Sequence, residues 1–264
     1  MSDPLAVIAR LPGVPEAVEE ARRAVDLLYR HRVLRRAGPA VSAESSLRGA
    51  RASAAIEGVD VPLDALRRDE VHDPVVQGAL RASAEMGRLG PTWRKAPRQV
   101  LARLHTAAAA GLADPAHLGR PRTDSPDQEA EVPDPLGLGP APGAKETGAR
   151  MEALFELLGT PTKAPALVLA AVVHAELAVL RPFGVADGVV ARAAERLTLV
   201  EYGLDPKSLA AVEVGHLELP YTDGLRAYLT GTGEGVAEWV RQSASAVTLG
   251  VREATAICEA LQRG

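Results

Sequence analysis

An apolar stretch followed by a tight loop constrains this chain more than any other feature of its sequence. Ala164 to Leu180 is a run of 17 mainly apolar residues, which is short for a membrane span and predicts a buried core helix. Pro182 ends that helix, because proline lacks an N–H and disfavours helical geometry at the residue before it. Gly184 and Gly188 permit backbone turns, and a second helical pattern begins near Asp187. A loop that leads into a helix N-terminus in this way is suited to holding an anion.

The composition places the chain among soluble globular proteins. Its 264 residues suffice for one large domain or two small ones, and hydrophobic residues make up 47% of them. The net charge of −4, with both signs interspersed, gives no electrostatic case for a nucleic-acid or membrane partner. The N-terminus makes a poor signal peptide, and the sole cysteine, Cys258, excludes an internal disulfide and four-cysteine zinc frameworks. We therefore expect a cytoplasmic protein.

Periodicity predicts helices along almost the whole chain and strands nowhere, so we expect an all-α fold. A long segment, residues 120–144, is dense in Pro, Gly and Asp and is expected to be a loop. We divide the chain into an N-terminal helical region (1–95), a core (96–245) and a C-terminal helix (246–264). The expected helices are Pro15 to Arg36, Val41 to Ile56, a short one capped by Asp60, one from Pro74 to Gly90 capped by Asp73, Pro97 to Ala110, Thr147 to Leu158, Pro165 to Leu180, Asp187 to Tyr202, Pro206 to Glu213, Pro220 to Leu229 and Gly235 to Gln262.

The loop and its flanks, LRPFGVADGVVARAAER from Leu180 to Arg196, resemble a known signature. They are similar to the motif H-P-F-x-[D/E]-G-N-G-R-x-x-R of the Fic/Doc family, whose members are all-helical and typically transfer AMP from ATP to a protein hydroxyl. Four positions match this motif: Pro182, Phe183, Gly188 and Arg192. Five positions differ: Arg181 stands where the family has its catalytic histidine, Val185 replaces the metal-binding acid, Ala186 a glycine, Asp187 the asparagine and Val189 the first arginine.

These replacements remove the chemistry that the resemblance implies. Arg181 stays protonated and cannot act as the base that the family histidine supplies. Val185 cannot ligate Mg²⁺, which prefers oxygen ligands. Asp187 suits the helix dipole but repels an arriving phosphate, and we expect it to pair with Arg181 across the loop. Any remaining ligand should touch the loop and helix start at Ala186, Asp187, Gly188 and Arg192.

A second motif lies in the N-terminal region. Ser53-Ala-Ala-Ile-Glu57-Gly58 fits the inhibitory pattern [S/T]-x-x-x-E-[G/N] of the same family, and Ser53 and Glu57 share one helix face. In the family this glutamate pairs with the second arginine of the loop and blocks the γ-phosphate site. The corresponding arginine is Arg192, so we predict a partly buried Glu57–Arg192 salt bridge. Gly58 is expected to cap the helix.

The resemblance covers roughly residues 41–245. Leu104-His105, Gly119 and Arg122 are similar to the family's LH…GxxR segment, and His174 stands seven residues before Arg181, where the family often has a histidine. The family docks its target peptide on a hairpin flap, but the prolines of residues 120–144 would interrupt backbone pairing there. The histidines have no metal-binding spacing, and His174 is expected to be a hydrogen-bonded core residue. We therefore predict no metal site.

The sequence favours a Fic-like protein with a degenerate loop, a pseudoenzyme that acts by binding or regulation. This leaves room for a protein partner and for a homo-oligomer, and it requires no cofactor. The alternative is a divergent nucleotidyl or phospho-group transferase that uses ATP and Mg²⁺ without the usual histidine. A third hypothesis is a structural remnant with no function in its cleft.

Overall fold

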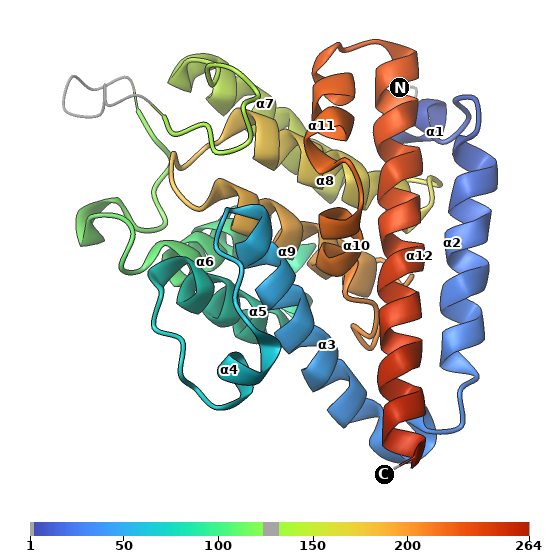
Figure 1. The fold of residues 1–264 in the computed structure, drawn as a ribbon. Coiled ribbons are helices and arrows are strands. Elements are labelled where there is room, and N and C mark those ends of the chain that lie inside the picture. Colours follow the sequence, from blue (N-terminus) through green and yellow to red (C-terminus); the bar gives the residue numbers. More distant parts are fainter. Residues whose placement is uncertain (1–2, 124–131, 264) are drawn as a thin grey trace.

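Helices make up nearly all of the regular structure, which confirms the predicted all-α fold. The computed structural model describes residues 3–123 and 132–263, and these contain no strand. The N-terminal half forms α1 (Pro4–Ile8), α2 (Val14–Tyr29), α3 (Leu34–Ile56), α4 (Leu63–Arg67), α5 (Pro74–Trp93), α6 (Pro97–Ala109) and the short 3₁₀ turn η1 (Pro115–His117). The C-terminal half forms α7 (Ala144–Gly159), α8 (Ala166–Leu180), α9 (Asp187–Glu201), α10 (Val212–Glu218), α11 (Tyr221–Leu229) and α12 (Gly233–Arg263) (Figure 1).

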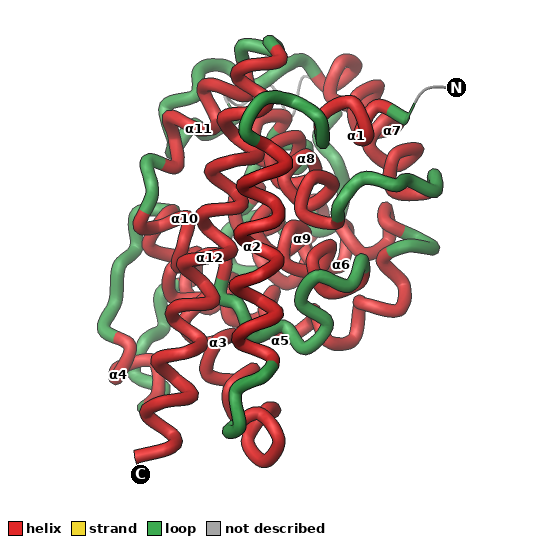
Figure 2. Tube along the Cα trace, turned by 90° about the vertical axis from the view of Figure 1, so that its right-hand side faces the viewer, coloured by secondary structure: helices red, strands yellow, loops and turns green. Residues whose placement is uncertain are grey.

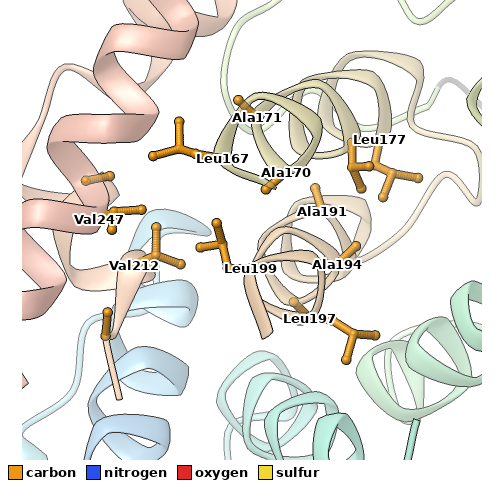
Figure 3. Packing of buried hydrophobic residues seen from close by; sticks show 14 of the residues in the cluster. Leu167, Ala170, Ala171, Leu177, Ala191, Ala194, Leu197, Leu199, Val212 and Val247 are labelled. Atoms are coloured by element: carbon orange, nitrogen blue, oxygen red, sulfur yellow. The ribbon is translucent and has the colours of Figure 1, made fainter. Parts of the chain in front are cut away.

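Helices α8 and α9 lie side by side at the centre of the fold (Figure 3). Small side chains face each other between them, among them Ala170 on α8 and Ala191 and Ala194 on α9, all fully buried. Alanines let two helix axes approach closely, and leucines such as Leu177 fill the space around them. Because α8 is covered on all sides, the apolar stretch that the sequence shows is a core helix, as predicted.

Helices α2 and α12 run in the same direction along one side of the molecule (Figures 1 and 2). Near their N-terminal ends Arg241 donates to the carbonyl of Pro12 at 2.9 Å, and near their C-terminal ends Arg32 donates to Gln262 at 3.2 Å. Buried apolar residues of both helices belong to the same cluster as those of α8 and α9. The first and last helices thus pack onto the core that carries the loop.

The predicted helix from Pro15 to Arg36 is wrong at its C-terminal end. Helix α2 stops at Tyr29, and α3 has already begun at Leu34. The predicted break around Pro39 is only a kink, with non-helical angles at Ala37. After this kink Pro39 lies in a first turn, where the missing N–H costs no hydrogen bond.

The predicted helix from Pro206 to Glu213 is also wrong, because side chains hold this backbone in another shape. The carboxylate of Asp205 accepts from the Ala210 amide at 2.8 Å, and Arg196 donates to the Ser208 carbonyl at 2.9 Å. Such bonds compete with helical ones. The helix in this region is α10, which begins at Val212.

One of the two predicted N-caps is present. Asp73 accepts hydrogen bonds from the amides of Val75 at 2.8 Å and Val76 at 3.3 Å, as expected for the start of α5. The cap predicted at Asp60 is wrong, because its carboxylate pairs with Arg51 and α4 begins without a side-chain cap.

The described parts of residues 120–144 are irregular up to the start of α7, in keeping with the predicted loop. Asp134 organises one turn by accepting from the amides of Leu138 at 2.9 Å and Gly139 at 2.7 Å. The centre of this predicted loop, residues 124–131 including Pro126, lies outside the described residues. Within the described ranges, no helix is long and apolar enough to cross a membrane.

Candidate functional site

Arg122 binds the backbone at the start of the loop between α8 and α9. Arg122 donates from Nε to the Arg181 carbonyl at 2.9 Å and from Nη2 to the Leu180 carbonyl at 3.1 Å, while its amide donates to the Pro182 carbonyl at 2.9 Å. These are carbonyls that the end of α8 leaves without helical partners. Arg122 therefore fixes the point at which the chain leaves α8.

An aromatic stack holds the next residue of the loop. The rings of His105, on α6, and Phe183 are stacked with centroids 4.2 Å apart. Burial lowers the pKa of His105 to about 4, so the ring is neutral near pH 7. Its Nδ1 accepts from the Gly119 amide at 2.9 Å. Three residues of the LH…GxxR segment, His105, Gly119 and Arg122, thus lie together next to the loop.

Arg181 binds the segment 133–139 and not a residue of α9. The residue has a left-handed backbone, with φ of 47°, and is only 6% exposed. Its Nη1 donates to the Pro133 carbonyl at 3.0 Å and lies 3.3 Å from a carboxylate oxygen of Asp134. The predicted salt bridge between Arg181 and Asp187 is therefore wrong, because acceptors in the segment 133–139 bind the guanidinium instead.

Asp187 is the first residue of α9 and is turned back into the loop. One carboxylate oxygen accepts from the Phe183 amide at 3.0 Å, and the other is buried without a hydrogen-bond partner among the described residues. Burial raises the pKa of Asp187 to about 7, against the opposing effect of backbone donors at Phe183 and Gly184. This carboxyl group consequently exchanges its proton near neutral pH.

The predicted salt bridge between Glu57 and Arg192 is present. Glu57 Oε1 lies 2.6 Å from Arg192 Nη2, and the side chains are 12% and 0% exposed. Arg192 also donates to Ser53, at 2.9 Å to Oγ and 3.0 Å to the carbonyl oxygen, and at 3.3 Å to the hydroxyl of Tyr221. Both polar residues of the second motif therefore bind the arginine.

Two glycines lie next to this pair and have different roles. Gly58 has a φ of 93° just after α3, the conformation expected of a helix-capping glycine. Gly188 has no side chain where the Glu57 carboxylate lies, and a Cβ added there would overlap it. The glutamate of α3 therefore lies directly on the first turn of α9.

A cavity of about 180 Å³ opens in front of the loop. Glu57 and Arg181 lie in its wall, together with Ala186, Asp187 and Gly188. Arg192, the fourth residue expected to touch a ligand, lies behind Glu57 and is not part of the wall. Val185 and Val189 also line the cavity and leave the wall without the acid and the arginine expected at those positions.

Sequence reasoning missed the residues that close this cavity from the other side. The wall there consists of Pro133 to Leu136 and Leu138, which follow no helical or strand period. No signal in the sequence links this segment to the loop, because Arg181 binds there to backbone carbonyls, which any residue would provide, and to one acid, Asp134, which belongs to no motif.

Solved structures resemble the whole arrangement. A Fic family protein from Desulfovibrio desulfuricans superposes with a TM-score of 0.72 at 21% identity, covering 91% of this chain and 74% of that one. Residues 134–508 of Fic-1 from C. elegans superpose with a TM-score of 0.68 at 18% identity, covering 93% and 73%. The chain has the Fic fold. No protein-family model and no curated protein matches the sequence. The likeness to Fic structures thus rests on the fold.

Proposed function

We propose that this chain is a Fic-fold protein without AMP-transfer activity, which acts by binding or regulating a protein partner. The observation that carries the proposal is the state of Arg181 at the position of the family's base. Its guanidinium is buried and bound to Pro133 and Asp134. A guanidinium is protonated at any physiological pH and cannot take a proton from a hydroxyl group.

The dimensions of the cleft support the same conclusion. Its volume of about 180 Å³ is below the roughly 300–1,000 Å³ of pockets that hold small molecules. Glu57 lies where a ligand would need to contact Arg192, because the two are joined at 2.6 Å. A negative carboxylate at that place also repels phosphate groups.

One observation favours the alternative, a divergent transferase. Asp187 lies in the wall of the cavity and has a pKa of about 7, near which a general base works best. Burial is the main cause of that value. In this second function Asp187 would accept the proton of a target hydroxyl in place of the missing histidine, once Glu57 has moved aside.

Calorimetry with ATP and Mg²⁺ distinguishes the two functions. We expect no binding at millimolar ATP by the natural protein, by Glu57→Gly, or by Glu70→Gly, a matched control that removes an exposed acid outside the cleft. If Glu57→Gly alone binds ATP, the pair of Glu57 and Arg192 regulates a working nucleotide site. The proposal of an inactive protein is then wrong, and Asp187→Asn and Arg181→His become the informative variants.

A further inference from the structure

Three ionisable side chains meet behind Arg192, in a part of the core that the cleft does not use. His174 comes from α8, Glu195 from α9 and His216 from α10, and none is more than 1% exposed. Glu195 Oε2 lies 2.7 Å from His174 Nδ1 and 2.7 Å from His216 Nε2. These three atoms all lie within 4.8 Å of one another. No sequence pattern pointed to the cluster, because each member lies 21 residues from the next.

The carboxylate of this cluster differs from the other buried acids in its partners. Elsewhere in the core Arg192 pairs with Glu57 and Arg196 pairs with Glu213. Glu195, by contrast, has two imidazoles and no Lys or Arg as partners within residues 3–123 and 132–263. Such a buried carboxylate is costly unless a positive charge accompanies it.

The donor atoms are those that zinc binds. Two imidazole nitrogens and one carboxylate oxygen are a common zinc ligand set, with a fourth position left for water. Ligands of a tetrahedral zinc lie about 3.3 Å apart, given bond lengths near 2.0–2.1 Å. Glu195 Oε2 would thus need to withdraw by about 0.6 Å from each ring, and the two ring nitrogens, which lie within 4.8 Å of each other, would need to reach the same separation of about 3.3 Å. Small side-chain rotations change donor positions by amounts of this order.

The surroundings supply what a zinc site needs beyond its ligands. A metal-binding histidine usually donates its other ring N–H to a fixed partner. His174 Nε2 lies 2.7 Å from the hydroxyl of Tyr221, which meets this requirement. His216 Nδ1 is buried without a hydrogen-bond partner among the described residues, and a small rotation of the ring toward the neighbouring pocket of about 250 Å³, which His216 and Tyr221 line, would let a water molecule accept from it.

We propose that His174 Nδ1, Glu195 Oε2 and His216 Nε2 bind one divalent metal ion of the zinc class, with water as the fourth ligand. The ion crosslinks α8, α9 and α10. It also fixes His174, which holds the Tyr221 hydroxyl that accepts from Arg192. The metal thereby supports the arginine of the cleft from behind, and the proposal does not depend on whether the cleft binds a nucleotide.

Metal analysis of the full chain, purified without an affinity tag from zinc-supplemented medium, tests the proposal. We expect about one zinc per chain in the natural protein and in the control His72→Asn, which removes an exposed histidine. The double variant His174→Ala, His216→Ala should retain less than about a tenth of that amount. Glu195→Gln keeps a hydrogen-bond acceptor for both rings but loses the charge, and should weaken zinc binding by more than about 10-fold.

Two further measurements keep the test decisive if the double variant does not fold. Adding zinc to the metal-free natural protein, at about 100 times its dissociation constant, should raise the melting temperature by roughly 5–10 °C. Cobalt(II) bound in its place should give the visible absorption of a tetrahedral complex. A natural protein with no zinc, no thermal shift and no cobalt spectrum would overturn the proposal and leave a triad joined by hydrogen bonds alone.

Discussion

The ion pair between α3 and α9 should be one of the strongest side-chain couplings in the molecule. The test is a double-mutant cycle of Glu57→Gln, Arg192→Met and the two together. Arg192 also binds Ser53 and Tyr221, so either single variant changes more than the pair. The cycle cancels those other contacts and isolates the interaction between the two charges.

The magnitude follows from distance and burial. Two unit charges about 4 Å apart interact by about 4 kcal/mol at the effective dielectric constant of about 20 that suits protein sites. Arg192 is fully buried, but Glu57 is 12% exposed at the cavity, so water weakens the attraction somewhat. We therefore expect a coupling energy of about 2–4 kcal/mol, well above the value of exposed pairs.

Urea unfolding followed by circular dichroism provides the assay, with equal m-values as the condition for comparing the four proteins. The pair of Glu19 and Arg22 on α2 is a control, because both side chains are about half exposed, at 48% and 57%. Glu19→Gln should leave the unfolding midpoint unchanged. A coupling energy below about 0.5 kcal/mol between Glu57 and Arg192 would refute the reasoning.

Three further predictions concern single side chains. Gly188→Ala places a methyl group on the Glu57 carboxylate and should cost about 1–3 kcal/mol in urea unfolding, and an unchanged midpoint would contradict the observed contact. Asp187 has a pKa raised to about 7 in the folded protein, so its contribution to stability is present below about pH 4 and lost as the pH rises through 7. We therefore compare the unfolding free energies of the natural protein and of Asp187→Asn. Their difference should fall between about pH 4 and pH 7, by at most about 1.4 kcal/mol per pH unit. A difference that does not change with pH would exclude the raised pKa of Asp187. Thr198→Val removes the acceptor that the Trp93 indole N–H binds at 3.0 Å and should cost about 1–3 kcal/mol, measured in the same way, and a cost below about 0.5 kcal/mol would show that the indole finds another acceptor.

The sequence predicted the fold where local rules act alone. The apolar run of α8, the proline at its end and the Asp73 cap of α5 follow from the properties of the residues themselves. The predictions failed where side chains outside a segment bind its backbone. Residues 206–211 are held by Asp205 and Arg196, so a plausible helical sequence is not helical there.

The candidate site likewise contains one feature that could be predicted from the sequence and others that could not. The pairing of Glu57 with Arg192 could be predicted because two motifs of a known pattern specify it. The orientation of Arg181 could not, because its partners, backbone carbonyls and the carboxylate of Asp134, lie in a segment without a pattern. The cluster of His174 and Glu195 also escaped prediction, because three helices must pack before its members meet.

Direct measurement of AMP transfer tests the central claim, that the loop has lost its chemistry. Glu57→Gly, which opens the cleft, would be incubated with Mg²⁺ and ATP labelled in the α-phosphate, alone and with a lysate of candidate protein acceptors. We expect no label on this chain or on any other protein above the level seen without the chain. Label that requires Glu57→Gly, and that disappears when Asp187→Asn is added, would contradict the account and establish a transferase.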